Sequence, residues 1–258
     1  MADFAVYDEN ALQRIVYFEH EPDPLDLLLL LDVSGSMHKS LTELASTARA
    51  ALRSLGSGDR VAVMLFARGS AVRQPFTMDF AAVEREIRTA VDTTDLGTGT
   101  AINAAIVAAA SFMGRQSSSG RRAILIVTDN LSLNYRIPDE DVIRALYAAD
   151  TTLNAILIGK QQHPAAPRPG QYFNTDFTPS DVFKLADQTG GEAMESHKAA
   201  ESFQLMIERI RSRYRLQYEA PAAAPGEYRH IRVVLAPGAR NRHENAVIKA
   251  RAGYYAVE

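Results

Sequence analysis

Cysteine is absent from the 258 residues of this chain. Disulfide bonds, catalytic thiols and zinc–thiolate sites are therefore excluded. The cellular compartment stays open, because a chain without thiols folds equally well in a reducing and in an oxidising environment.

Long apolar runs are absent as well. Residues 25–31 form an apolar run, but it is far too short to cross a bilayer and it contains Asp26. The N-terminal sequence MADFAVYDEN has neither the basic start nor the apolar core of a secretory signal peptide. We therefore expect no membrane span and no signal peptide in the chain as given.

Neither sign of charge is in excess. The chain has 28 basic and 31 acidic residues and a net charge of −3, which gives no electrostatic reason to expect a nucleic acid as partner. Its 47% apolar and 23% charged residues are ordinary for a soluble globular protein. The length allows one large α/β domain, or one domain with an appendage.

What is present is an alternation of strand and helix patterns. Continuous apolar segments of strand length predict strands buried on both faces of a parallel sheet, at residues 25–31, 61–66, 123–128 and 153–158. Apolar residues at spacings of three and four predict helices that begin near residues 41, 80, 102, 142, 181 and 203. Residues 71–76 follow 61–66 after a short turn and predict one antiparallel edge strand. The fold class is therefore α/β, with a Rossmann-like, doubly wound and mostly parallel six-stranded sheet flanked by helices.

The two ends of the chain have a different, period-two pattern that is typical of half-exposed strands. It occurs at residues 4–7, 15–18, 215–220, 231–235 and, as a third C-terminal candidate, 246–254. Pro/Gly-rich turns at Pro221–Gly226 and Pro237-Gly238 are expected to join the C-terminal strands. We predict that the ends pair into a small β appendage made of residues 1–24 and 215–258, beside an α/β domain at 25–214.

The longest irregular stretch is at residues 161–175. The basic run from Arg209 to Arg215 is interpreted as a solvated helix end.

The strongest chemical signal is the segment Asp32-Val33-Ser34-Gly35-Ser36, at the end of the first buried strand. Ligands of open α/β sheets bind at the carboxyl ends of the strands. Alternate residues here offer one carboxylate and two hydroxyls, and such hard oxygen donors favour Mg²⁺, Mn²⁺ or Ca²⁺. The same three side chains would also suit a helix N-cap, which is the alternative reading.

Two further strand ends can reach the same place. Thr100, in the segment LGTGTA, precedes a predicted helix, and Asp129 ends the strand at 123–128. The predicted metal ligands are therefore Asp32, Ser34, Ser36, Thr100 and Asp129, with Thr98 as an alternative to Thr100. Neutral hydroxyls leave the cation electrophilic and some of its positions open to water, so a partner's Asp or Glu can coordinate it. None of the six histidines lies in these motifs, and no general base is evident.

The segment LLLLDVSGSM at residues 28–37 resembles the metal-ion-dependent adhesion site (MIDAS) of the von Willebrand factor type A family. The resemblance continues in order over roughly residues 25–214, through GDRVAV at 58–63, PFT at 75–77, GTAI at 99–102, IVTD at 126–129 and TGG at 189–191. It implies that Ser34, Ser36 and a threonine or aspartate coordinate the metal, and that part of the carboxylate contact is through water. One departure is Asn130, where the family usually has glycine. The flanks resemble an acidobacterial subgroup that is generally exported, which implies an extracytoplasmic location.

These observations predict a metal-dependent protein-binding module, with Mg²⁺ (or Mn²⁺ or Ca²⁺) coordinating an acidic residue of a protein partner. We expect no enzymatic activity. The main alternative is an Mg²⁺-dependent phosphatase of the haloacid-dehalogenase type, which also places an aspartate after a buried first strand. That chemistry needs a second acidic residue two positions later, where this chain has Ser34. A third possibility is an interaction scaffold with a vestigial metal site.

Overall fold

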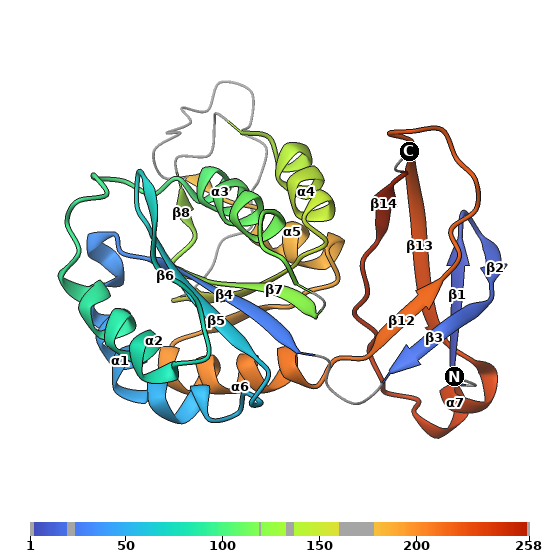
Figure 1. The fold of residues 1–258 in the computed structure, drawn as a ribbon, viewed down its shortest axis with the longest axis horizontal. Helices are drawn as coiled ribbons and strands as arrows, with labels where there is room; N and C mark the ends of the chain where they lie inside the picture. Colours follow the sequence, from blue (N-terminus) through green and yellow to red (C-terminus); the bar gives the residue numbers. More distant parts are fainter. Residues whose placement is uncertain (1–2, 20–23, 119, 133–136, 160–177, 257–258) are drawn as a thin grey trace.

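The computed structural model describes residues 3–19, 24–118, 120–132, 137–159 and 178–256. The irregular stretch expected at residues 161–175 lies outside them. An α/β part and a smaller part made of strands stand side by side in Figure 1. The smaller part, called the β lobe below, consists of residues 3–19 and 215–256 and contains both ends of the described chain.

A six-stranded sheet with the order β11-β9-β7-β4-β5-β6 forms the centre of the α/β part. Its strands are β4 (Leu25–Asp32), β5 (Arg60–Phe66), β6 (Ser70–Thr77), β7 (Arg121–Thr128), β9 (Thr152–Ile158) and β11 (Ala193–Ser196). All neighbours are parallel except β5 and β6, so the predicted sheet with one antiparallel edge strand is confirmed. Strand β11 has no strand signal in the sequence, because its four residues, AMES, contain no apolar run.

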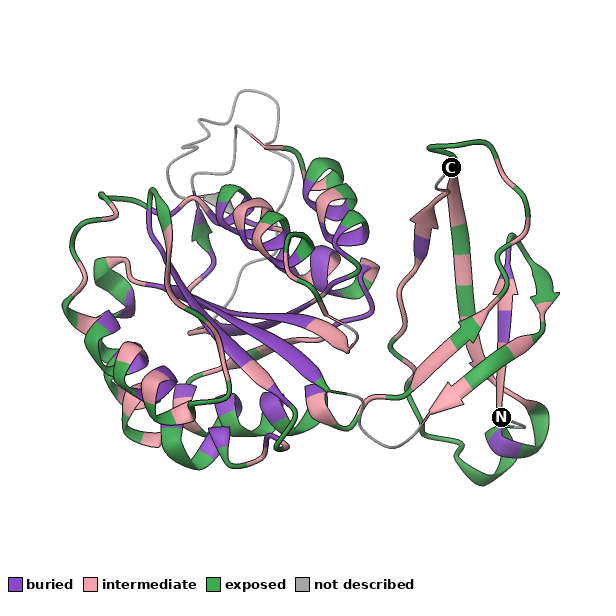
Figure 2. Ribbon diagram, in the orientation of Figure 1, coloured by how far each residue is buried: buried purple, intermediate pink, exposed green. Residues whose placement is uncertain are grey.

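Strand β4 lies in the middle of the sheet, and all eight of its residues are buried. Its leucines alternate between two cores: Leu27, Leu29 and Leu31 belong to one, and Leu28 and Leu30 to the other. Figure 2 shows the buried sheet between partly exposed helices. Burying a leucine stabilises a fold by about 1.5–3 kcal/mol, so the run of leucines holds the strand at the centre of the sheet.

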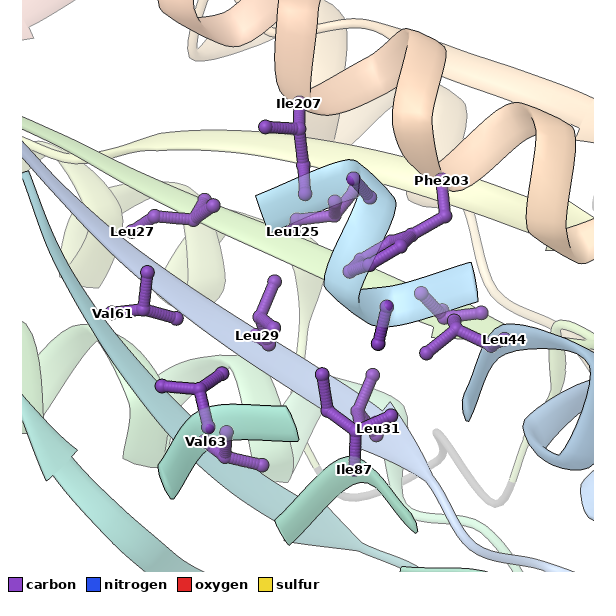
Figure 3. Close-up of a cluster of buried hydrophobic side chains, with 14 of the residues drawn as sticks. Leu27, Leu29, Leu31, Leu44, Val61, Val63, Ile87, Leu125, Phe203 and Ile207 are labelled. Atoms are coloured by element: carbon purple, nitrogen blue, oxygen red, sulfur yellow. The ribbon is translucent and has the colours of Figure 1, made fainter. Parts of the chain in front are cut away.

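Helices cover both faces of the sheet. The first face packs against α1 (His38–Leu52), α2 (Phe80–Thr89) and α6 (Ala199–Arg211). Figure 3 shows this core, with Phe203 and Ile207 of α6 near the leucines of β4. The second face packs against α3 (Ile102–Gly114), α4 (Asp139–Ala148) and α5 (Val182–Gln188). Short 3₁₀ turns precede α1 at Gly35–Met37 and follow α2 at Ala90–Asp92. No helix among the described residues is long and apolar enough to cross a membrane.

The β lobe joins the two ends of the chain. Its strands are β1 (Phe4–Asp8), β2 (Ala11–Gln13), β3 (Ile15–Glu19), β12 (Arg215–Tyr218), β13 (Tyr228–Leu235) and β14 (Gly253–Tyr255). Strands β14-β13-β1-β2 form one sheet, and β12 pairs with β3. Because β1 pairs with β13 and β3 with β12, the predicted β appendage from the two chain ends is present.

Two expectations for the C-terminal segment were wrong. Only residues 253–255 of the strand expected at 246–254 form a strand, because the preceding residues turn toward α5. There the Ala252 N–H donates to the Gln188 carbonyl, and Arg251 bridges to Thr189. The turn expected at Pro237-Gly238 is instead the start of a short helix, α7 (Pro237–Arg242), whose first turn suits proline.

The interpretation of the basic run from Arg209 to Arg215 as a solvated helix end was also wrong in part. Arg211 makes a 2.8 Å ion pair with Asp59, which is fully buried and also accepts the backbone N–H groups of Leu25 and Gly56. Arg213 is half-buried and donates to the Gly190 carbonyl. These arginines anchor the C-terminal end of α6 under the sheet.

The β lobe encloses a buried carboxylate, Asp8. It accepts hydrogen bonds from the hydroxyls of Tyr218 and Tyr254, at 2.8 and 2.9 Å, and from Nε of Arg229 at 2.8 Å. Burial alone would raise the pKa of Asp8. The hydrogen bonds from Tyr218, Arg229 and Tyr254 together outweigh it, so the pKa of Asp8 is lowered.

Candidate metal centre

The loop that carries the first candidate residues leaves the sheet abruptly after β4. Asp32 is paired in register with Phe66 of β5, and the Val33 N–H still donates to the Phe66 carbonyl at 2.9 Å. A 3₁₀ turn then leads directly into α1, and Met37 in that turn is fully buried. The loop between strand and helix is therefore short and held at both ends.

The Asp32 carboxylate is fully buried, and each of its oxygens accepts a hydrogen bond. Oδ1 accepts the backbone N–H of Ser34 at 2.9 Å, and Oδ2 accepts the hydroxyl of Thr128 at 2.6 Å. Burial, reinforced by the negative charge of Asp129, outweighs these bonds and raises the pKa of Asp32 to about 6. No Lys, Arg or His among the described residues forms an ion pair with Asp32 or Asp129.

The two serines of the loop lie next to each other. Their Oγ atoms are 3.3 Å apart, with Ser36 exposed and Ser34 half-buried. Neither serine side chain caps a helix: the 3₁₀ turn after Ser34 has no side-chain cap, and neither has α1. The helix-cap reading of this motif therefore finds no support in the hydrogen bonds.

Asp129 follows β7, the strand next to β4, and is half-buried. One of its carboxylate oxygens, Oδ1, accepts the Leu131 N–H at 3.2 Å. Asp129 also acts electrostatically on Asp32, as the raised pKa of that residue shows. The structure thus brings Asp32, Ser34, Ser36 and Asp129 to one edge of the sheet.

Thr100 stands on a third loop, just before α3. The loop is tied to the end of β5 by a 2.9 Å hydrogen bond from the Ala101 N–H to the Ala67 carbonyl. On its other side, Ser132 donates its hydroxyl to the Thr100 carbonyl and accepts the Ile102 N–H, both at 3.3 Å. Thr100 is only 6% exposed, and its hydroxyl has no hydrogen-bond partner within the described residues. Thr98 is exposed.

Comparison with known proteins gives the family. Residues 27–131 match the sequence model for the von Willebrand factor type A domain. The chain contains a von Willebrand factor type A domain. The match includes the candidate loops at Asp32, Thr100 and Asp129. No curated protein sequence matches the chain.

Solved structures share the fold of this von Willebrand factor type A domain at low sequence identity. A von Willebrand factor type A protein from Catenulispora acidiphila is 19% identical, with a TM-score of 0.54, over 80% of this chain and 49% of that one. The conserved hypothetical protein BatB from Bacteroides thetaiotaomicron is 17% identical, with a TM-score of 0.52, over 72% and 97%. Proximal thread matrix protein 1 from the mussel byssus, described with a zinc-occupied MIDAS motif, is 13% identical, with a TM-score of 0.55, over 78% and 49%.

Asn130, the departure from the family pattern, has a structural explanation. Its φ of 63° lies in the left-handed region, where glycine is favoured and asparagine is among the best tolerated of the other residues. Its side-chain N–H₂ donates to the Ser180 carbonyl at 3.1 Å, and its backbone N–H donates to Thr128 Oγ1 at 3.2 Å. Asparagine therefore keeps the turn and adds a link to the segment before α5.

The donor set fits a hard divalent cation. Two carboxylates, one of them fully buried, and the adjacent hydroxyls of Ser34 and Ser36 lie at the ends of neighbouring strands, and no described cationic side chain pairs with either carboxylate. In the described part of the chain, no group of three or more His, Cys, Asp or Glu is arranged so that it could hold a metal ion. A cation held largely by hydroxyls would relieve the buried negative charge that raises the pKa of Asp32.

Two residues of this arrangement were missed in the sequence, Thr128 and Ser132. Thr128 links β7 to Asp32, and Ser132 links the segment after Asp129 to the Thr100 loop. A signal for Thr128 exists, since it is a hydroxyl at the end of an otherwise apolar strand. Ser132 has no such signal, because its hydrogen bonds to the Thr100 loop join it to backbone atoms about thirty residues away.

Proposed function

We propose that this von Willebrand factor type A domain is a divalent-metal-dependent protein-binding module. Ser34, Ser36 and Thr100 would hold the cation through their hydroxyls, with Asp32 and Asp129 completing the site, partly through water as in the family. Mg²⁺ is the proposed ion, with Mn²⁺ and Ca²⁺ as alternatives. An Asp or Glu of the partner protein would take the position left to water.

One observation carries this proposal: the buried Asp32 carboxylate lies within electrostatic range of Asp129, and no described cationic side chain pairs with either. Leaving a buried charge uncompensated is costly, and a bound cation removes that cost. The unpartnered Thr100 hydroxyl supports Thr100 over Thr98, which is exposed.

The arrangement of residues favours binding over catalysis. The cation supplies a Lewis-acidic position for a carboxylate, because hydroxyl donors do not neutralise its charge. A hydrolytic site also needs a general base. Asp32 and Asp129 are assigned to the cation, and Asp95 on the Thr100 loop is paired with Arg73. The haloacid-dehalogenase alternative needs an acid at the position of Ser34, whose hydroxyl instead lies 3.3 Å from that of Ser36.

The proposed binding domain spans residues 25–214, and residues 1–24 and 215–258 form a β appendage to it. An extracytoplasmic location is proposed with it. One structure with this fold, 19% identical and with a TM-score of 0.50, is described as an aerotolerance-related membrane protein from Bacteroides fragilis.

Calorimetric titration of the purified protein with Mg²⁺, Mn²⁺ and Ca²⁺ tests the site. We expect one-site binding of at least one ion, lost in the Ser34→Ala/Ser36→Ala double variant. The two serines lie on the surface loop and cap no helix, so this variant should keep its melting temperature in EDTA. If none of the three ions gives a heat of binding, the protein is a scaffold with a vestigial site. Phosphatase turnover with Mg²⁺ that Asp32→Asn abolishes would replace the binding module by an enzyme.

A pull-down with the wild type and the double serine variant then tests the interaction. We expect partners that bind the wild type in Mg²⁺ and are lost in EDTA and in the double variant. A partner set that does not change would move the interaction surface away from these loops.

A further inference from the structure

The rim of the proposed metal site is different on its two sides. Strands β7, β4 and β5 are consecutive in the sheet, and the site lies over β4. The segment after β7 carries Leu131, a large apolar side chain that is 47% exposed. The turn after β5 carries Arg68, an exposed cation.

Arg68 is held in place by its backbone and its stem. The residues on either side of it are fixed, because the Gly69 N–H donates to the Leu96 carbonyl at 2.8 Å and the Ala67 carbonyl accepts from Ala101. The side chain runs along Gly97, where an added Cβ would come within 3.3 Å of the Arg68 Cβ. Gly97, with a φ of 80°, thus lets the arginine stem pass close to the loop that carries Thr100.

The charge of Arg68 has no partner within the described residues. The nearby acidic residue of the same loop, Asp95, is already paired with Arg73 at 2.5 Å. Arg68 therefore keeps a positive charge available one strand away from the proposed cation.

Leu131 is fixed on the opposite side. Its N–H donates to Asp129 Oδ1, and it belongs to the short strand β8 (Leu131–Ser132), which pairs with β10 (Thr178–Pro179). Most of the large apolar residues of this part of the chain are buried in the two cores, so an exposed leucine beside Asp129 is an apolar contact point at the site.

We propose, as an inference that rests on the proposed function, that the partner is an extended protein segment with a defined order of three side chains. An acidic residue in the middle binds the cation, a second acidic residue on one side pairs with Arg68, and an apolar residue on the other side contacts Leu131. Adjacent strands are about 4.8 Å apart, so the backbones of β7 and β5 are separated by about 10 Å. Every second residue of an extended peptide faces the same way, so the outer two of three such residues are about 14 Å apart. The difference of about 4 Å is within the reach of the long, exposed Arg68 side chain.

Synthetic peptides test this order directly. The diacid peptide is acetyl-Ser-Leu-Ser-Glu-Ser-Glu-Ser-amide, and the monoacid peptide has Gln in place of the second Glu. A third peptide has Ser in place of Leu. The fourth, acetyl-Ser-Glu-Ser-Leu-Ser-Glu-Ser-amide, has the leucine between the two acidic residues. Dissociation constants are measured by NMR titration of the whole chain, in Mg²⁺ and in EDTA.

We expect the wild type to bind the diacid peptide about two- to fivefold more tightly than the monoacid peptide in Mg²⁺, as befits an exposed charge pair. Arg68→Gln should remove this preference and leave the affinity for the monoacid peptide within about twofold. The matched control is Arg53→Gln, which removes an exposed arginine at the end of α1 remote from the site. Leu131→Ser should abolish the difference between the peptides with and without leucine.

The outcomes separate the two proposals. Two results would overturn the assigned partner and leave the metal-dependent module in place. One is equal affinity for the diacid and monoacid peptides in Mg²⁺. The other is an equal loss of affinity in Arg53→Gln and Arg68→Gln. Equal binding of the peptide with leucine in the middle would overturn the assigned order of side chains across the site. If none of the peptides binds in an Mg²⁺-dependent way, both proposals fail for peptide ligands.

Discussion

Thr128 and Asp32 join two neighbouring strands at the candidate site through a 2.6 Å hydrogen bond from the threonine hydroxyl to the carboxylate. Thr128 Oγ1 also accepts the Asn130 N–H, so the buried carboxylate and the turn after Asp129 are held by one hydroxyl. After this turn the chain reaches Ser132 in β8, which holds the Thr100 loop. Strand β7 and its continuation therefore set the positions of the other two loops.

Replacement of Thr128 by valine should lower both stability and metal affinity. The substitution conserves shape but removes the donor to Asp32, and an unmade hydrogen bond to a buried charged group costs about 1–3 kcal/mol. Urea denaturation in EDTA measures the first effect and calorimetry with Mg²⁺ the second. Thr128→Ser, which keeps the hydroxyl, should stay close to the wild type. A valine variant with unchanged Mg²⁺ affinity would show that this bond does not position Asp32.

Thr100 and Thr98 provide a comparison within one loop. Thr100→Val should weaken Mg²⁺ binding about tenfold or more, because a coordinating hydroxyl is lost in a side chain of similar shape. Thr98→Val should change the affinity by less than about twofold, since Thr98 is exposed. Both are compared by calorimetry after their melting temperatures have been matched in EDTA. The reverse order of effects would move the ligand to Thr98.

Asp32→Asn should stabilise the metal-free protein and abolish its response to metal. Burial raises the pKa of Asp32 to about 6, so the ionised carboxylate destabilises the metal-free fold at neutral pH. Asparagine removes this cost, and we expect a gain of about 1–3 kcal/mol in urea denaturation in EDTA. Added Mg²⁺ should stabilise the wild type and leave the variant unchanged. A variant that is less stable than the wild type in EDTA would contradict this account of the buried charge.

Asp8 should make the β lobe sensitive to acid. Its pKa is lowered in the folded state, because the bonds from Tyr218, Arg229 and Tyr254 outweigh burial, which raises it. The stabilisation is therefore fully present above the unfolded pKa of about 3.9 and is lost as the pH falls through the folded value. Asp8→Asn should lose about 2–3 kcal/mol at neutral pH, by breaking a buried charged network, and should show a weaker pH dependence in acid.

Urea midpoints between neutral and acidic pH measure this effect. Asp95 is the matched control, since its pKa is also lowered, by a hydrogen bond from Arg73, but its side chain is 64% exposed. Asp95→Asn should change the pH dependence little, because solvent screens the pair. Identical behaviour of the two variants would show that burial of Asp8 does not matter.

Arg211 and Arg209 should differ in their importance for stability. Arg211→Met leaves the fully buried Asp59 without its cation, and we expect a loss of about 2–4 kcal/mol, since two backbone N–H groups still bind that carboxylate. Arg209 pairs with Glu192 at the surface, so Arg209→Met should cost less than about 1 kcal/mol. Chemical denaturation of the two variants side by side gives the comparison. Equal losses would mean that the Asp59 pair is no stronger than a surface pair.

The arrangement of the sheet was largely determined by the amino-acid sequence itself. A run of leucines at residues 25–31 can be buried only where both faces are covered, and β4 indeed lies at the centre of the sheet. The alternation of Asp32, Ser34 and Ser36 after that strand, with Thr100 and Asp129 at two other strand ends, likewise indicates the candidate ligands. These features are local, because they depend on residues close together in the chain and on the period of the backbone.

Other features were decided only by the tertiary structure. The register that pairs Leu31 with Val127 brings Asp32 beside Thr128. The hydroxyl at the end of an apolar strand is visible in the sequence, but the carboxylate that it contacts is not. Strand β11 forms because it completes the sheet beside β9, although its own residues are a weak strand pattern. Residues 246–252 leave the expected strand because bonds to Gln188 and Thr189 compete for them. Hydrogen bonds between segments far apart in the chain decide such details, and they exist only once the apolar cores have brought those segments together.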